Sequence, residues 1–437
     1  MPLDRLPIPR RTRPRTAPAA PALAVLAASA ALALASAPPG AAAPPPGGSA
    51  PPPGATAPAP TVEERRLSRP EPQEILRRGG LADAGPSLER ALGRARSLHR
   101  AEAAVARHGA ALWERAVARA QGRGPARGDL ARGDDRPLYW ARLDMTARLR
   151  HWEPPFALDA ADRARLEERL ERSSRGQDSL RFPGGGVVRR VVVTGFDPFT
   201  LDRDIRIGNP SGAAALALDG TWIRTPDGPA RVEAAVFPVR WEDFTGGEVE
   251  RTLAPVLPRA DLFATVSQGR VGRFDIERFN GAWRGGFPDN ANLSRTGTVP
   301  VSDPASQPQW TATTLPYAAI TEAATGPFPV LDNTAVTEIP AGSGEPVLRP
   351  QGPTPGSTAR AGGGGDYLSN EIAYRATLLR DRLAPGVPGG HVHTPVLRFG
   401  EGNTSQVTDP EYVRNRRAIV EQVRMIITVA LEAPPGR

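Results

Sequence analysis

The sequence has 437 residues, of which 40% are hydrophobic and 23% are charged, with 45 glycines and 49 prolines. This composition excludes a wholly disordered chain and a polytopic membrane protein, and it allows one or two folded domains with low-complexity linker. The chain has no cysteine, which excludes disulfides, thiolate metal sites and a cysteine nucleophile. The net charge is +8, but the first 16 residues hold five arginines against one aspartate, so the remainder carries only +4. Because that excess forms no basic stripe, we expect no nucleic-acid partner.

The N-terminus is typical of an export signal. An arginine-rich stretch ends near Arg15, and an uncharged, alanine-rich segment follows over residues 19–37. Small residues continue to Ala43 and offer several cleavage sites. We therefore predict a signal peptide over residues 1–43 and a secreted or cell-envelope protein with no stable membrane span in the mature chain. The alternative is an uncleaved anchor helix. Residues 44–61 are rich in Pro, Gly and Ala and are predicted to be a solvated linker.

Residues 62–180 are predicted to form a small helical N-terminal region. Segments 87–121 and 159–173 place apolar residues three and four apart among Ala, Arg and Glu, which indicates amphipathic helices. Residues 122–135 break this pattern. The histidines of the region stand apart from other metal-ligating residues, so surface or packing roles are expected for them. They are His99, His108 and His151.

An α/β domain is predicted over residues 187–432, with a sheet covered by helices on both faces. Residues 187–194 are rich in β-branched side chains, like a buried parallel strand, and Asn209 opens a helix that Gly220 closes. Strands then alternate with helices, which implies right-handed crossovers. Residues 325–365 are rich in Pro, Gly and Thr and are predicted to be a long loop beside the site. Further strands are expected over residues 231–239, 261–267 and 390–397, and further helices over residues 241–257, 367–383 and 409–431.

Two glycine-containing turns stand where α/β proteins usually build their sites. Residues 194–199 (TGFDPF) place two phenylalanines on a Gly/Pro turn, which could wall a small ring or simply belong to the core. The glycine run 362–365 leads into a helix that carries Ser369 near its start. Free backbone N–H groups at such a position can stabilise an oxyanion, although a serine there is also a common N-cap. No Gly-Lys-Ser/Thr follows the run, which disfavours a phosphate-binding loop.

His391 and His393 occupy one predicted strand two residues apart, so both point to the same face. Such a pair could bind a metal. No carboxylate or cysteine stands at ligand spacing, however, so we favour one catalytic histidine with the other packed or hydrogen-bonded. No metal and no cofactor are expected.

Together these residues resemble pyroglutamyl peptidase I, the family of pyrrolidone-carboxylyl peptidases. The family's TGFEPFGG-like turn and NPS helix start are similar to residues 194–199 and 209–211, and its GQ…GR…IxxER segment is similar to residues 267–278. The motifs keep the family's order over about residues 187–430. The other matching segments are PDN at 288–290, TLP at 314–316, GGDYLSN at 364–370 and VHTP at 392–395.

The resemblance implies a three-layer, phosphorylase/hydrolase-like α/β fold and an amide hydrolase that removes N-terminal pyroglutamate through a Cys–His–Glu triad. Carried over by position, Glu277 is the orienting carboxylate, His393 is the base, and Ser369 takes the place of the nucleophilic cysteine. The family's arginine before the PDN triplet has no clean counterpart, and Arg284 is the nearest candidate. The residues expected to face the lactam ring are Phe196, Phe199 and Gln268.

The serine at position 369 is the main departure from the family pattern. A thiol ionises readily beside an imidazolium, whereas a hydroxyl must lose its proton to the base during attack. Three hypotheses follow. The first is a secreted Ser–His–Glu hydrolase of peptides or small amides. The second is a catalytically silent homologue that binds pyroglutamyl or related peptide ends. The third is a structural surface protein displayed through the linker. The sequence leaves the oligomeric state open.

Overall fold

Helices form the first part of the described chain. The computed structural model describes residues 59–125, 127–182, 184 and 188–434, so the predicted signal peptide and nearly all of the predicted linker lie outside the described residues. Among the residues that are described, no helix has both the length and the apolar character needed to cross a bilayer. The helices of this region are α1 (Val62–Arg66), α2 (Pro70–Gly79), α3 (Ala84–Gly93), α4 (Leu98–Ala120), α5 (Arg136–His151), α6 (Ala160–Ser174) and the 3-10 helix η1 (Gln177–Ser179).

One of the two long helices predicted in this region is interrupted. The helix expected at 159–173 is α6, and the side chain of its N-cap Asp159 accepts a hydrogen bond from the Asp162 N–H at 2.7 Å. The helix expected over 87–121 is instead two helices, because α3 ends at Gly93 and Ser97 caps the start of α4. Glycine weakens a helix and serine favours the N-cap position, which explains the break.

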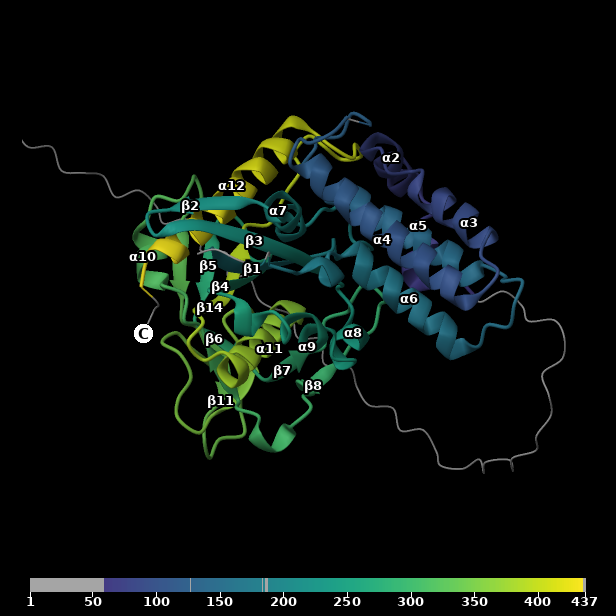
Figure 1. The fold of residues 1–437 in the computed structure, drawn as a ribbon. Helices are drawn as coiled ribbons and strands as arrows, with labels where there is room; N and C mark the ends of the chain where they lie inside the picture. The colour runs from purple at the N-terminus through teal and green to yellow at the C-terminus, as the bar shows by residue number, and fades with distance from the viewer. Residues whose placement is uncertain (1–58, 126, 183, 185–187, 435–437) are drawn as a thin grey trace, which may run out of the picture. The chain divides into compact units, whose positions relative to one another are not determined.

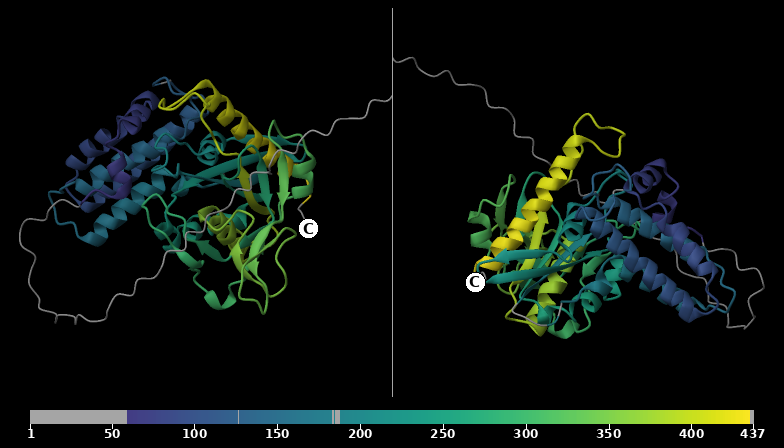
Figure 2. Two further views of the ribbon diagram at one scale, coloured as in Figure 1. Left: turned by 180° about the vertical axis from the view of Figure 1, so that it is seen from behind. Right: turned by 45° about the horizontal axis from the view of Figure 1, so that its top comes forward.

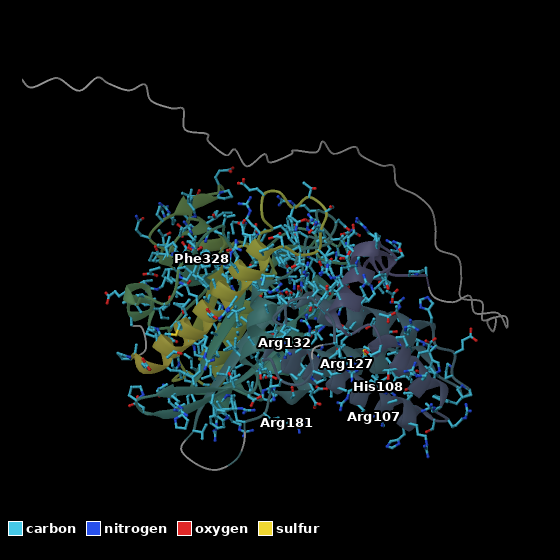
Figure 3. The ribbon with its side chains drawn as sticks, turned by 90° about the horizontal axis from the view of Figure 1, so that it is seen from above. Arg107, His108, Arg127, Arg132, Arg181 and Phe328 are labelled. Carbon is cyan, nitrogen blue, oxygen red and sulfur yellow. The ribbon has the colours of Figure 1, made fainter. Side chains whose placement is uncertain are left out.

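The histidines of the helical region belong to no metal-ligating cluster of three or more side chains in the described part of the chain. His151 contacts the Ala147 carbonyl through Nδ1 at 2.7 Å, and His99 is exposed. Burial, followed by the charge of Arg107, lowers the pKa of His108. Figure 3 shows His108 and Arg107 together on the helical region. The expected surface and packing roles therefore fit these residues.

A seven-stranded sheet of order β10-β5-β14-β4-β1-β3-β2 forms the centre of the α/β part. The middle strands β14, β4, β1 and β3 run parallel to one another, and these are the four strands predicted from the sequence. Strand β5 runs antiparallel to β14, and β10 pairs with β5 in parallel. Strand β2 pairs with β3 in the antiparallel sense. The bounds are β1 (Arg189–Phe196), β2 (Trp222–Thr225), β3 (Gly228–Phe237), β4 (Leu262–Gln268), β5 (Phe274–Glu277), β10 (Val330–Asn333) and β14 (Gly389–Thr394).

Helices cover both faces of this sheet (Figures 1 and 2). Val191 and Val193 of β1 pack in a core cluster with α7 and α12, whereas Val192 between them packs in a cluster with α9 and α11. Alternate residues of one buried strand thus face opposite helical layers, which confirms the predicted three-layer α/β class. The helices are α7 (Pro210–Leu218), α8 (Trp241–Thr245), α9 (Glu248–Leu253), α10 (Tyr317–Glu322), α11 (Leu368–Leu383) and α12 (Pro410–Glu432), with the 3-10 helices η2 (Leu257–Arg259) and η3 (Pro304–Ser306).

Two further sequence predictions are wrong. The helix expected over 241–257 divides into α8 and α9 because Gly247 adopts a left-handed conformation with φ of 79°. Residues 325–365, expected to be a loop, contain β10 and a small sheet of order β12-β11-β13. Each of these strands has only three or four residues, too few for an alternating pattern to be recognised. The remaining strands are β6 (Phe279–Gly281), β7 (Trp283–Gly285), β8 (Thr296–Thr298), β9 (Trp310–Ala312), β11 (Val336–Ile339), β12 (Val347–Arg349) and β13 (Thr358–Ala361).

Candidate active site

A cavity of about 390 Å³ opens where β1, β4 and β14 end and α11 begins. Five of the six predicted site residues line this cavity, and the sixth, Glu277, is fully buried behind His393. Ligand sites of parallel sheets commonly lie at this edge. The lining residues are Phe196, Phe199, Asn209, Val239, Ser267, Gln268, Gly269, Arg270, Phe287, Gly363, Gly364, Gly365, Asp366, Tyr367, Leu368, Ser369 and His393.

The predicted base and carboxylate form a hydrogen-bonded pair. His393 Nδ1 lies 2.7 Å from Glu277 Oε1, and both side chains are buried. The contact depends on the reversed direction of β5, which lies antiparallel to β14 and brings its last residue beside the histidines. A carboxylate can only accept here, so it selects the tautomer with the proton on Nδ1. His393 Nε2 has no hydrogen-bond partner among the described residues, and it is therefore available as a proton acceptor in the cavity.

Two further side chains hold Glu277, and neither was predicted from the sequence. Asn333 at the end of β10 donates from Nδ2 to Glu277 Oε2 at 2.6 Å and to the Gly363 carbonyl at 3.0 Å. Arg270 Nη1 lies 3.6 Å from Glu277 Oε1 and 2.9 Å from Asp275 Oδ2. Arg270 lies two residues beyond the predicted Gln268, so proximity in sequence could have suggested it. Asn333 lies in the segment predicted to be a loop, and nothing in the sequence around it indicates a contact with Glu277.

Ser369 lies in the same cavity but is not hydrogen-bonded to His393 in the described chain. Its Oγ donates to the Gly364 carbonyl at 3.2 Å. Ser369 is the second residue of α11, and the N-cap is Tyr367, which makes no side-chain capping bond. The N-cap alternative for Ser369 is therefore wrong. The first amides of α11 lack a side-chain cap, so the helix presents N–H donors beside the serine.

Glycines allow the two sides of the cavity to approach closely. A Cβ atom at Gly364 would lie 2.8 Å from His393 Cε1, and one at Gly363 would lie 2.2 Å from Glu277 Oε2. A Cβ atom at Gly269 would lie 2.6 Å from the His393 Cβ. The glycine run that precedes α11 therefore packs directly on the histidine–glutamate pair, and Gly364 contacts both His393 and the Ser369 hydroxyl.

Aromatic rings form the apolar part of the cavity. The predicted ring-facing residues Phe196 and Phe199 line it, Phe196 being buried and Phe199 lying 6.2 Å from the Tyr367 ring. Phe287 also packs against Tyr367, with 5.2 Å between the ring centroids. The third predicted residue, Gln268, lines the cavity while its Oε1 accepts from the Leu397 N–H at 3.1 Å.

Two other candidates have structural roles. His391 is fully buried between Thr265 Oγ1 at 2.7 Å and Ser267 Oγ at 2.8 Å, and burial lowers its pKa well below the usual value. This is the packed, hydrogen-bonded role expected for the second histidine. Arg284 does not line the cavity and instead makes two hydrogen bonds to Glu371, at 2.6 and 2.5 Å.

Comparisons with solved structures find similar folds among peptidases. A mutant pyrrolidone carboxyl peptidase from Pyrococcus furiosus is 22% identical, with a TM-score of 0.38, and the match covers 55% of this chain and 98% of that one. The pyroglutamyl peptidase I of Bacillus amyloliquefaciens is 20% identical, with a TM-score of 0.39, and the match covers 56% of this chain and 96% of that one.

Sequence comparisons match both parts of the chain. The PA0049 N-terminal domain family matches residues 46–171, and the PA0049 C-terminal domain family matches residues 190–306 and 328–398. A Pseudomonas aeruginosa protein named "Uncharacterized protein PA0049" is 34% identical, and the match covers 74% of this chain and 76% of that protein. The chain described here therefore belongs to the PA0049 family.

Proposed function

We propose that this chain is a pyroglutamyl-peptidase-like amide hydrolase that removes N-terminal pyroglutamate through Ser369, His393 and Glu277. The observation that carries the proposal is the 2.7 Å bond between His393 and Glu277 in a cavity that Ser369 also lines. Acyl transfer by serine requires a histidine oriented by a carboxylate and a hydroxyl within its reach, and here the oriented histidine and the serine line one cavity. The ordered motifs shared with pyroglutamyl peptidase I support the same substrate.

In the proposed reaction, His393 Nε2 takes the proton of Ser369 while Oγ attacks the carbonyl carbon of the pyroglutamyl group. The carbonyl oxygen becomes an oxyanion, and uncapped N–H groups at the start of α11 would hold it. His393 then returns the proton to the leaving amine as the C–N bond breaks. Water, activated by the same imidazole, hydrolyses the ester that remains on Ser369.

The nucleophile must rotate before it can react. Its hydroxyl donates to the Gly364 carbonyl in this structure, so attack requires that bond to be exchanged for one to His393. Gly364 contacts both side chains, so in the proposed reaction a change of side-chain rotamer at Ser369 exchanges the Gly364 carbonyl for the imidazole. Such catalytic hydrogen bonds are often made only in the substrate complex.

A lactam end group suits the proportions of the cavity. Phe196, Phe199 and Tyr367 line the cavity and would contact the methylene groups of a small ring, and Gln268 adds an amide side chain to the lining. Small-ligand sites commonly combine apolar walls with a few polar groups in this way. We further propose that the chain acts outside the cytoplasm, because residues 1–43 have the composition of a signal peptide.

The direct test is turnover of a fluorogenic pyroglutamyl amide, with the matching prolyl amide as the substrate control. We expect release of the fluorophore from the pyroglutamyl compound, and a loss of at least about a thousandfold in Ser369→Ala. His99→Gln is a histidine control, because His99 is exposed and does not line the cavity, and it should keep turnover. Absence of turnover by folded protein at neutral and mildly alkaline pH would refute the hydrolase.

The hydrogen bond from Ser369 to Gly364 favours one alternative, a silent homologue that only binds pyroglutamyl ends. A hydroxyl held by a carbonyl in the resting state cannot also donate to the imidazole. Calorimetry with a pyroglutamyl dipeptide separates the two functions, since the silent homologue would bind it and release no product. If the dipeptide neither binds at millimolar concentration nor is cleaved, both functions are refuted.

A further inference from the structure

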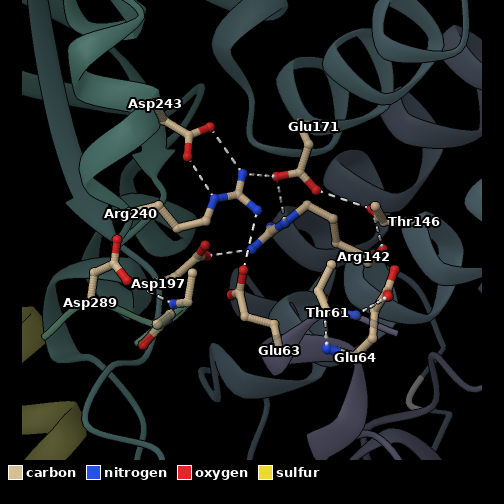
Figure 4. A network of polar contacts seen from close by, with 12 residues as sticks. Thr61, Glu63, Glu64, Arg142, Thr146, Glu171, Asp197, Arg240, Asp243 and Asp289 are labelled. Atoms are coloured by element: carbon tan, nitrogen blue, oxygen red, sulfur yellow. Dashed lines mark hydrogen bonds and ion pairs between the residues drawn. The ribbon is translucent and has the colours of Figure 1, made fainter. Parts of the chain in front are cut away.

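The helical N-terminal region contacts the segments that form the cavity wall. Asp197 lies between Phe196 and Phe199, the two aromatic residues of the first turn, and its carboxylate is buried. Arg142 of α5 donates to Asp197 Oδ1 at 2.5 Å, and Arg175 at the end of α6 bonds to Oδ2. Figure 4 shows Arg142 reaching Asp197. Both of these partners of the Asp197 carboxylate come from the helical region.

Two asparagines hold the backbone of the same turn. Asn209 Nδ2 donates to the Asp197 carbonyl at 2.9 Å, and Asn290 Nδ2 donates to the Pro198 carbonyl at 2.8 Å. Each asparagine is itself bound by the helical region. Asp135, which precedes α5, accepts from the Asn209 N–H at 2.8 Å, and Arg66 of α1 donates to the Asn290 carbonyl at 2.6 Å.

Further contacts with the helical region support the neighbouring wall residue, Val239. Arg240, which follows it, bonds to Glu171 of α6 at 2.9 Å and to Glu63 of α1 at 3.3 Å (Figure 4). The Val239 carbonyl accepts from the Asn290 N–H at 3.0 Å, so this contact joins the asparagine described above. Three separate helices, α1, α5 and α6, thus reach loops that line one cavity.

Burial makes these contacts strong determinants of position. The side chains of Arg142, Arg175 and Asp197 are 2%, 3% and 4% exposed. A buried charge is costly unless it is paired, so the turn is held where both guanidinium groups can reach its carboxylate. The apolar cores are also continuous, because α3, α4, α5 and α6 share one cluster of buried residues with the sheet, α7 and α12. The described residues of both parts belong to one compact unit.

We infer that the helical N-terminal region is a working part of the ligand site, and that Asp197, held by Arg142 and Arg175, is a positioning residue for the aromatic wall. Asp197 touches no substrate in this scheme. It fixes the turn so that Phe196 and Phe199 are positioned to contact the ring of a lactam end group. The choice of a lactam as the ligand rests on the proposed function. Loss of the ion pair would leave the chemistry at Ser369 and His393 intact and loosen recognition.

The test compares Arg142→Met with Arg148→Met in the full chain. Arg148 also lies on α5, but its partners Asp144 and Glu89 belong to the helical region, which makes it a matched control. In Arg142→Met we expect amide hydrogen exchange over residues 195–200 to rise at least about tenfold, while strand β4 stays protected. For the pyroglutamyl amide we expect KM to rise about tenfold with kcat within a few-fold of the parent. Arg142→Lys should recover most of the loss, and Arg148→Met should change neither quantity.

A folded Arg142→Met protein with parental exchange and parental KM would overturn the inference. If Arg142→Met does not fold, Arg66→Met is the second variant. It leaves no buried carboxylate without a partner, because Asp202, the ion-pair partner of Arg66, is more than half exposed. That variant should raise exchange over residues 289–293, and unchanged exchange there would count against the inference. If the parent protein neither binds nor cleaves the pyroglutamyl compound, the proposed function fails. The exchange comparison still decides the positioning role by itself.

Discussion

The two sides of the cavity differ in how completely they are assembled. On the strand side, His393 is bound to Glu277, and Glu277 is in turn bound to Asn333 at 2.6 Å and approached by Arg270. On the helix side, Ser369 donates to a backbone carbonyl of its own loop, and the first amides of α11 lack a side-chain cap. The His393–Glu277 pair is therefore held by buried partners, whereas on the helix side the Ser369 hydroxyl bonds, among the described residues, only to the Gly364 carbonyl and the first amides of α11 have no side-chain cap.

This difference matches what each side would contribute to the proposed serine reaction. A general base must keep one tautomer and one orientation throughout the cycle, which buried partners provide. The nucleophile and the oxyanion donors must instead exchange partners when substrate arrives. Substitutions on one side at a time should therefore change turnover in different ways.

The largest effect should come from the fixed side. Replacing Glu277 by Gln removes the negative charge that selects the Nδ1–H tautomer of His393, and we expect turnover of the pyroglutamyl amide to fall by about a factor of ten thousand. Steady-state kinetics with a folded variant measures it. Glu338→Gln is the matched control, since Glu338 is equally buried and hydrogen-bonded but lies off the cavity. A loss of less than tenfold in Glu277→Gln would show that the carboxylate does not orient the base.

The helix side should respond to Ser369→Cys in the opposite direction. A thiol near an imidazole forms thiolate more readily than a hydroxyl ionises, so we expect turnover to rise by up to about a hundredfold. The natural chain has no cysteine, so the new thiol would be the only one and its pKa can be read from the pH dependence of alkylation. We expect that pKa to lie below about 8.5 and to return to it in the double variant with His393→Ala. An unperturbed thiol pKa in Ser369→Cys would mean that His393 does not interact with the side chain at position 369.

A smaller effect should follow from Asn333→Ala, which deletes one hydrogen bond to Glu277 and leaves the carboxylate in place. The lost bond to a charged group predicts a fall in kcat of about tenfold to a hundredfold, with KM little changed. Asn333→Asp should be worse than alanine, because it sets a second carboxylate against Glu277. Parental kcat in both variants would mean that Asn333 only supports β10.

The smallest effect concerns stability. His391 is buried and hydrogen-bonded as a neutral ring, and burial lowers its pKa well below 6.5. Below about pH 6.5 this histidine is protonated in the unfolded chain but stays neutral in the folded chain. The free energy of unfolding therefore decreases as pH falls, by up to about 1.4 kcal/mol per pH unit. Urea unfolding of His391→Gln at about pH 7.5 and about pH 5.5 should show a weaker dependence than the parent protein. His99→Gln, at an exposed histidine, should leave the dependence unchanged, and an unchanged dependence in His391→Gln would contradict the assignment.

The sequence predicted the parts of this molecule that carry a repeated local signal. The β-branched run before Thr194 and the Asn-Pro-Ser start of α7 located the parallel centre of the sheet, and the order of short motifs led to Glu277, Ser369 and His393. It could not place Asn333, because β10 has four residues and joins Glu277 only when the strand is added at the sheet edge. Nor does any spacing connect Arg142 to Asp197, 55 positions apart. Such partners are set by how the helices pack on the sheet.

The ion pair between Arg142 and Asp197 also limits how such chains can be recombined. A chimera with its crossover between these positions takes one charge from each parent. Where the parents differ at either position, one ion is stranded in the interior at a cost of several kcal/mol. In a library shuffled between this chain and its 34% identical relative, crossovers inside residues 142–197 should therefore give folded members only where the two parents supply matching charges at these positions. For protein engineering, the helical region and the α/β sheet are best exchanged as a single block.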